Sequence, residues 1–270
     1  MTFKMIATDL DGTLLDSKKQ IMPASVAALQ TAKNLGIKVV LTSSRPLSGI
    51  RPFLKQLYLD GNQQYAILYN GGLIQDLDGG ILATEGLDYH DFEKFAQFWA
   101  NNDIHCHFET LTNFLTMDRE LSLQMARNSE LTRMPILIKD RADFTPAFHF
   151  LKSEFTGTAE QIVAFKKNLP AWFTQDYSVV QSNAYTLAVT SKKASKGAAV
   201  KKLAEKLGFD QSEVIIFGDQ GNDLSMFKNP KFFKVAMKNG IEPVRMRANY
   251  VTQDNNHDGV AIALNKFVLN

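Results

Sequence analysis

The chain carries, near its amino end, the run Met5-Ile6-Ala7-Thr8-Asp9-Leu10-Asp11-Gly12-Thr13-Leu14-Leu15. The apolar residues at its start predict a buried β-strand, and Asp9 and Asp11 follow at the carboxyl end of that strand. In open α/β sheets, ligands bind beyond the carboxyl ends of the strands. No Arg or Lys stands beside the two carboxylates in sequence, so they would repel each other unless a divalent cation relieved the repulsion. Gly12 allows the backbone to turn sharply after the pair.

Strand and helix patterns alternate over the first part of the chain. Apolar runs at 37–41 and 65–69 predict two further strands, and residues 23–33 and 47–57 show the apolar spacing of helices. This alternation predicts a parallel sheet with helices on both faces. A second Asp-x-Asp-Gly run follows the polar residue Gln75, and we interpret it as the turn of a hairpin.

The pattern changes at about Thr84 and returns after Thr190. Between these points we predict helices over 92–99 and 158–167, and strands over 104–109, 114–117, 148–155, 177–181 and 185–189. After residue 190 we predict a helix over 195–207 and strands at 214–217, 234–237 and 250–251. The chain is therefore expected to have a discontinuous α/β core, residues 1–83 plus 190–270, interrupted by an α+β domain over residues 84–189.

Composition limits the class of protein. The hydrophobic fraction of 45% is ordinary for a folded globular chain, and no apolar stretch approaches the roughly 20 residues that span a bilayer. The net charge of +2 comes from dispersed Lys and Arg, so we expect neither nucleic acid nor a membrane as partner. The single cysteine, Cys106, excludes an internal disulfide and fits a reducing compartment. With no signal peptide in view, we expect a cytoplasmic protein, a monomer or a homodimer.

Three more segments place polar groups at strand ends or helix starts. Ser43 follows the 37–41 strand, where its hydroxyl and the next backbone N–H groups could hold a phosphate oxygen; a helix cap is the alternative. Lys196 begins a helix, which is unfavourable unless an anion lies nearby, although a solvated lysine is the simpler interpretation. Asp219 and Asp223 belong to a tight loop after an apolar strand, and such oxygen ligands suit Mg²⁺; an Asx turn with a helix cap is the alternative.

These segments resemble, in the same order, the four motifs of the haloacid dehalogenase (HAD) superfamily. The resemblance rests on Asp9-Leu10-Asp11-Gly12-Thr13-Leu14, Thr42-Ser43-Ser44-Arg45, Ser195-Lys196-Gly197 and Gly218-Asp219-Gln220-Gly221-Asn222-Asp223. Residues 70–72, 235–240 and 256–260 are similar to segments of the Cof-type subgroup (subfamily IIB). The resemblance implies a Rossmann-like doubly wound core with an inserted α+β cap of the C2 type, which residues 84–189 match by their placement between the second and third motifs.

The resemblance also implies a reaction. By this resemblance the protein would be an Mg²⁺-dependent phosphatase that hydrolyses small phosphorylated metabolites through an aspartyl-phosphate, with sugar phosphates as the default substrates. Asp9 would be the nucleophile and Asp11 the general acid/base. A phosphomutase is the nearest alternative, and basic residues of the middle domain such as Arg119 and Arg127 keep it open. A regulator that binds phosphometabolites without catalysis is a further alternative, although it would be expected to have lost Asp9, Asp11 or Lys196.

The ligand sets follow from the same resemblance. Asp9, the Asp11 main-chain carbonyl and Asp219 would hold the metal, with Asp223 supporting the metal or the lysine. The residues that would bind the phosphate are Gly12, Ser43, Lys196 and Asn222. Thr42 remains the alternative to Ser43, because Ser44 stands where the family usually has glycine.

Two histidines of the predicted 104–109 strand, His105 and His107, would share one face of it. A metal site is conceivable there. We identify no carboxylate or second cysteine beside them in sequence, and we therefore expect ordinary side chains of a strand. The aromatic residues of the middle domain are expected to form its core rather than to bind a cofactor.

Overall fold

The computed structural model describes residues 2–270, apart from the side chain of Ser182. By its internal contacts the chain divides into two compact units, Met1–Thr84 with Ser195–Asn270, and Glu85–Ala194. That these units are domains with boundaries at 83/84 and 189/190 stays a prediction. Within residues 2–270, no helix combines the length and the apolar character that a membrane span requires.

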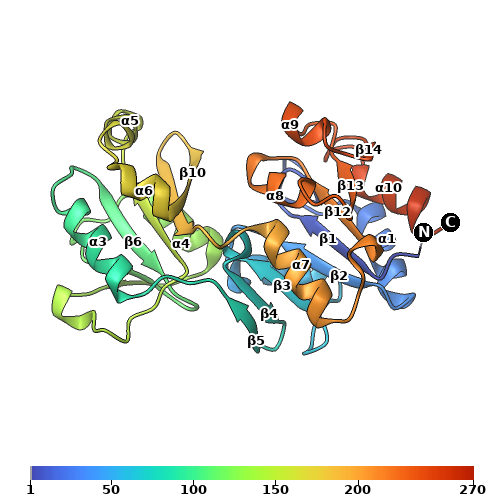
Figure 1. The fold of residues 1–270 in the computed structure, drawn as a ribbon, viewed down its shortest axis with the longest axis horizontal. Coiled ribbons are helices and arrows are strands. Elements are labelled where there is room, and N and C mark those ends of the chain that lie inside the picture. Colours follow the sequence, from blue (N-terminus) through green and yellow to red (C-terminus); the bar gives the residue numbers. More distant parts are fainter. Residues whose placement is uncertain (1) are drawn as a thin grey trace. The chain divides into compact units, whose positions relative to one another are not determined.

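An eight-stranded sheet forms the centre of the first unit (Figure 1). Its strand order is β14-β13-β12-β1-β2-β3-β4-β5. The parallel strands are β1 (Met5–Asp9), β2 (Lys38–Thr42), β3 (Tyr65–Leu68), β12 (Val214–Gly218), β13 (Phe233–Ala236) and β14 (Tyr250–Val251). The hairpin expected around Asp76–Gly80 is present as β4 (Leu73–Asp76) and β5 (Ile81–Thr84), which run antiparallel at one edge.

Helices cover both faces of this sheet. Met5 and Ala7 of β1 lie in one apolar cluster with α7 (Lys196–Lys206) and α8 (Leu224–Phe227), and Figure 1 shows α7 over one face of the sheet. Ile6 lies between them in sequence, is fully buried and faces the other way. On that side α1 (Pro23–Asn34) packs with α10 (Gly259–Phe267). The doubly wound α/β fold expected from the sequence is confirmed. The remaining helical segments of this unit are α2 (Leu47–Gln56), α9 (Glu242–Arg245), η1 (Tyr69–Gly71), η3 (Gln211–Glu213) and η4 (Gly221–Asp223).

The second unit is built on a six-stranded sheet with the order β10-β11-β9-β6-β7-β8. Its strands are β6 (His105–Glu109), β7 (Phe114–Thr116), β8 (Ile136–Ile138), β9 (Lys152–Thr156), β10 (Tyr177–Asn183) and β11 (Thr186–Ser191). All neighbouring strands are antiparallel except β7 and β8. Because side chains alternate along a strand, β6 turns Cys106 and Phe108 to one face and His107 and Glu109 to the other.

An aromatic core fills the face that carries Phe108. The helices packed there are α3 (Tyr89–Trp99), α5 (Ala159–Lys167) and α6 (Ala171–Asp176). Phe95 of α3 is fully buried, with its ring centroid 4.7 Å from that of Tyr177 and 5.3 Å from that of Phe173. Aromatic pairs in such arrangements contribute about 0.5–1.5 kcal/mol each beyond the burial of apolar surface. The aromatic residues of this unit therefore form its core, as expected.

Several elements of the second unit were not predicted. Helix α4 (Leu123–Thr132) lies on the polar face of the sheet, where Met125 packs on Phe114. The segments α4, α6, β8 and η2 (Arg141–Asp143) are short or weakly periodic, so their hydrophobic pattern gives little signal. The predicted strand over 148–155 is wrong at its start, because β9 begins at Lys152. The apolar residues before it join the aromatic core instead, with the rings of Phe148 and Phe150 stacked 5.4 Å apart.

Candidate active site

Four of the predicted segments meet at the carboxyl edge of the core sheet. Asp9 ends β1, Ser43 follows β2, Asp219 follows β12, and Lys196 begins α7. Strands β2, β1 and β12 are parallel neighbours, so their carboxyl ends lie side by side. Thr13, in the turn after β1, donates a hydrogen bond to Asp219 Oδ1 at 2.8 Å and so links the first and fourth motifs.

Lys196 lies among the carboxylates of this edge. Its side chain is fully buried, and its ammonium donates to Asp9 Oδ1 and, at 2.7 Å, to Asp223 Oδ1. Burial acts to lower the pKa of Lys196, but the charges of Asp223 and Asp9 hold that pKa above its ordinary value. The interpretation of Lys196 as a solvated lysine is therefore wrong. Asp223 is held from its other side as well, since its Oδ2 accepts the backbone N–H groups of Asp219 and Gln220 at 2.9 and 3.0 Å.

Three buried carboxylates cluster beside this ammonium, two of which it contacts directly. Asp9, Asp219 and Asp223 each offer an oxygen, and these oxygens lie within 4.8 Å of one another. Burial, together with the charges of Asp223 and Asp219, raises the pKa of Asp9 well above its ordinary value, while burial raises the pKa of Asp219 to about 6. Three carboxylates against one ammonium leave two negative charges uncompensated. A divalent cation with oxygen ligands, such as Mg²⁺, fits this donor set.

Gly12 shapes the loop beside this group. Its φ of +87° lies in the left-handed region, and a Cβ at this position would stand 2.5 Å from Asp219 Oδ2. The left-handed turn therefore favours glycine, and a larger residue would also displace the carboxylate of Asp219. The carbonyl of Gly12 accepts a hydrogen bond from Asn239 Nδ2 at 2.8 Å, a contact that was not predicted. A role for Gly12 in phosphate binding stays a prediction.

Asp11 is held by cations that sequence adjacency did not reveal. Arg45 donates through Nε to Asp11 Oδ2 at 2.8 Å and through Nη2 to Oδ1 at 2.7 Å, and Lys19 Nζ lies 2.8 Å from Oδ1. Burial acts to raise the pKa of Asp11, yet Arg45 and then Lys19 bring that pKa below its ordinary value. Although no Arg or Lys stands beside the two aspartates in sequence, the fold gives each a cationic partner: Lys196 for Asp9, and Arg45 with Lys19 for Asp11. Arg45 stands 34 residues after Asp11 in sequence, and the two residues meet because β1 and β2 are neighbours in the sheet.

The remaining predicted phosphate ligands have local partners. The hydroxyl of Ser43 is buried and accepts the backbone N–H of Arg45 at 3.2 Å, as a cap would. Thr42 Oγ1 is also buried and has no hydrogen-bond partner within residues 2–270. The choice between the two hydroxyls stays open. Asn222 Nδ2 donates to Asn70 Oδ1 at 3.1 Å, which brings the fourth motif to the Asn70-Gly71-Gly72 segment.

Known proteins resemble this chain over its full length. A family model described as haloacid dehalogenase-like hydrolase matches residues 6–264. A Streptococcus pyogenes serotype M6 protein named "Putative phosphatase M6_Spy0533" is 34% identical over 274 residues, with 100% of both chains covered. The crystal structure of a haloacid dehalogenase-like hydrolase from Bacteroides thetaiotaomicron has a TM-score of 0.86 at 29% identity and covers 98% of this chain and 99% of its own. The HAD subclass IIB sugar phosphatase BT4131 shares the fold, with a TM-score of 0.78, 20% identity and 98% of each chain covered. Fold, motifs and sequence similarity together show that the chain belongs to the haloacid dehalogenase-like hydrolases.

Proposed function

We propose that this protein is an Mg²⁺-dependent phosphatase that hydrolyses small phosphorylated metabolites through an aspartyl-phosphate on Asp9. The observation that carries the proposal is the buried ammonium of Lys196 between Asp9 and Asp223, with Asp219 beside them. Such a group can hold a metal ion and a phosphate at once, because its negative and positive charges lie within a few ångströms of one another. We also propose a cytoplasmic protein, a monomer or a homodimer, on the grounds of composition given above.

Asp9 is the nucleophile in this proposal. Lys196 fixes Asp9 Oδ1, which leaves the other oxygen to attack phosphorus in line with the leaving oxygen. The bond from Asp9 to phosphorus forms as the ester P–O bond breaks. A water molecule then attacks the same phosphorus, which releases inorganic phosphate and restores the Asp9 carboxylate. Lys196, Asn222 and a hydroxyl from Ser43 or Thr42 would bind the other phosphoryl oxygens.

The residues that would hold Mg²⁺ are Asp9, Asp219 and the main-chain carbonyl of Asp11. Mg²⁺, when bound, screens the repulsion between the phosphate and the attacking carboxylate. Asp223 fits a supporting role better than direct ligation, because Lys196 and two backbone N–H groups already occupy its oxygens. Gly12 leaves Asp219 the room to approach the group.

Asp11 is the general acid and base in this proposal. It must carry a proton when the leaving oxygen departs, and it must take a proton from water in the second step. Its ion pairs with Arg45 and Lys19 favour the carboxylate form, as the lowered pKa of Asp11 indicates. These pairs therefore have to open before Asp11 can donate a proton. Arg45 would thus control when Asp11 acts as an acid.

Phosphate release from a panel of phosphorylated metabolites, with and without Mg²⁺, tests the proposal. Sugar phosphates come first, because the structurally similar BT4131 is named a sugar phosphatase. We expect Mg²⁺-dependent release from the wild-type protein and none from a folded Asp9→Asn variant. Near wild-type turnover by that variant would refute the role of Asp9, and isomerisation of a sugar phosphate without phosphate release would point to a mutase.

A further inference from the structure

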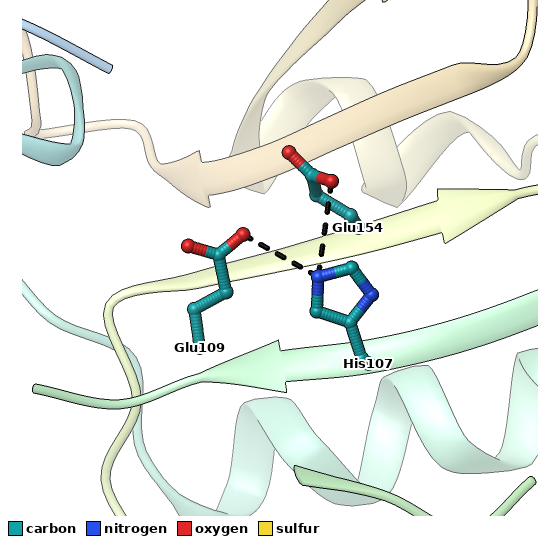
Figure 2. Close-up of side chains that lie close together, drawn as sticks. All are labelled: His107, Glu109 and Glu154. Atoms are coloured by element: carbon teal, nitrogen blue, oxygen red, sulfur yellow. Dashed lines mark ion pairs between the residues drawn. The ribbon is translucent and has the colours of Figure 1, made fainter. Parts of the chain in front are cut away.

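A second group of metal-ligating side chains lies in the unit Glu85–Ala194, away from the aromatic core of that unit. His107 and Glu109 project from β6 and Glu154 projects from β9, and all three are buried (Figure 2). The strand register brings them together, since His107 stands opposite Glu154 in the antiparallel pair. The expectation that no carboxylate accompanies this histidine is therefore wrong. Glu109 shares its face two residues later, and Glu154 arrives only through the pairing of β6 with β9.

The imidazole of His107 is buried without a hydrogen-bond partner. Its exposure is 0%, and neither ring nitrogen has a partner within residues 2–270. Nε2 points between the two carboxylates, 3.4 Å from Glu109 Oε1 and 3.8 Å from Glu154 Oε2, as Figure 2 shows. These distances exceed the roughly 2.7–2.9 Å of a charge-assisted N–H···O bond. Phe114 stacks on the ring, with centroids 4.5 Å apart, and holds it in this orientation.

The distances from His107 Nε2 to the two carboxylates are close to those of a tetrahedral metal site, and all three ligand atoms lie within 4.8 Å of one another. In such a site, bonds of about 2.0–2.2 Å to zinc place the ligand atoms roughly 3.3–3.6 Å apart. The distance from His107 Nε2 to Glu109 Oε1 lies in this range, and the one to Glu154 Oε2 exceeds it only slightly. One imidazole and two carboxylates also form a donor set that divalent first-row metals bind. We propose that His107, Glu109 and Glu154 form a second metal site, separate from the Asp9 group, for a divalent transition-metal ion such as Zn²⁺.

Lys152 is the competitor of that ion. Its buried ammonium lies 2.7 Å from Glu109 Oε1 and 2.9 Å from Glu154 Oε1. Glu154 still turns Oε2 toward His107, where Asn128 Nδ2 also donates to it at 2.6 Å. With His107 neutral, two carboxylates and one ammonium leave a net negative charge that attracts a further cation. Because the ion and Lys152 share Glu109 Oε1, Lys152 weakens metal binding, and removal of its charge should strengthen it.

Zinc binding by the full-length chain tests the proposal. The experiment uses an Asp219→Asn background with Mg²⁺ in excess, so that the Asp9 group contributes little to zinc binding. Equilibrium dialysis with elemental analysis should find one Zn²⁺ per chain. His107→Gln should weaken this binding at least tenfold. His105→Gln is the matched control, since His105 lies on the same strand face but is one-third exposed and pairs with Asp118 instead; it should bind zinc like the background protein.

Two further variants separate metal binding from a merely structural role. Lys152→Met should bind Zn²⁺ at least tenfold more tightly. Glu109→Gln is nearly isosteric and keeps the pair of Lys152 with Glu154, so it should lose zinc yet keep its circular dichroism spectrum. This variant decides the matter if His107→Gln does not fold. The proposal is overturned if the background protein binds no Zn²⁺, if folded Glu109→Gln retains it, or if His105→Gln loses it equally. None of these measurements depends on phosphatase activity.

Discussion

Replacing Lys196 by Met removes the one ammonium that Asp9 and Asp223 share. Methionine keeps the unbranched apolar stem but brings no charge, so the formal charge of the group that includes Asp219 changes from −2 to −3. Removal of one partner from a buried ion pair costs about 3–5 kcal/mol, because it leaves an uncompensated buried charge. Lys196 is 0% exposed, so water cannot take its place without rearrangement. We expect Lys196→Met to lower the free energy of unfolding at pH 7 by about 3–5 kcal/mol.

The assay is urea unfolding, followed by circular dichroism, with EDTA present. Lys201→Met on the same helix is the matched control. The side chain of Lys201 is half exposed and its ammonium lies 3.8 Å from Glu205, so this substitution should lower the free energy of unfolding by no more than about 0.5 kcal/mol. Adding Asp219→Asn to Lys196→Met should recover about 1 kcal/mol, because one of the repelling carboxylates is neutralised.

The pH dependence gives a second, independent readout. The pKa values of Asp9 and Asp219 are already raised in the folded protein, and loss of Lys196 should raise that of Asp9 further. A carboxyl whose pKa is higher in the folded state binds more protons there than in the unfolded state, so folding stability rises as pH falls. The loss of unfolding free energy caused by Lys196→Met should therefore become smaller as the pH is lowered from 7 to 5. A deficit below about 1 kcal/mol at pH 7, or one that is the same at both pH values, would refute the reasoning.

Three other expectations concern single positions. Gly12→Ala should lower the free energy of unfolding by about 1–2 kcal/mol, because the backbone there is left-handed. It should also weaken Mg²⁺ binding in calorimetric titration, because the new Cβ meets Asp219. Gly36→Ala is the control: its φ is a similar +85° and no atom lies within 4 Å of the new Cβ, so it should lose stability but not Mg²⁺ affinity. Phe95→Ala should destabilise the protein by about 3–5 kcal/mol in thermal unfolding, and a change under 1 kcal/mol would contradict its central place in the aromatic core. Cys106 is buried, and burial raises the pKa of its thiol. Mass spectrometry should therefore find no alkylation of Cys106 in the folded protein and complete alkylation in urea. Rapid labelling of the native protein would contradict this, because it would show that the thiol is accessible.

Local sequence patterns predicted what lies at the strand ends of the core. Asp9 and Asp219 each stand at the end of an apolar run, and each run forms a parallel strand. Ligands bind at the carboxyl ends of such strands, which is where both aspartates lie. Lys196 was recognisable only by its motif, since composition alone favoured a solvated side chain. Its burial depends on carboxylates from β1 and from the loop after β12, and no local pattern encodes that meeting.

Two of the contacts that were missed depend on the pairing of strands. Arg45 reaches Asp11 because β2 lies beside β1, and Glu154 reaches His107 because β9 pairs with β6 in one register. A shift of one residue would turn Glu154 to the aromatic face, so its position depends on the register of the whole pair. Helix α4 was missed for a different reason, since few of its residues are apolar and only Met125 and Thr132 are buried; a polar contact from Asn128 to Glu154 adds to the packing of Met125.

The strand order of the core has a consequence for synthesis on the ribosome. β1 is central, yet one of its two neighbours, β12, is encoded beyond the inserted unit, and Lys196 follows Asp9 by 187 residues. At a synthesis rate of about 5–20 residues per second, β12 and Lys196 leave the ribosome roughly 10–40 s after β1. Throughout that interval one edge of β1, whose residues are all buried in the folded protein, is unpaired and open to association with other nascent chains. Residues 85–194 have time to fold first, whereas chains that end before β12 should aggregate through β1. We therefore expect the yield of folded protein to depend on how long that edge of β1 stays unpaired.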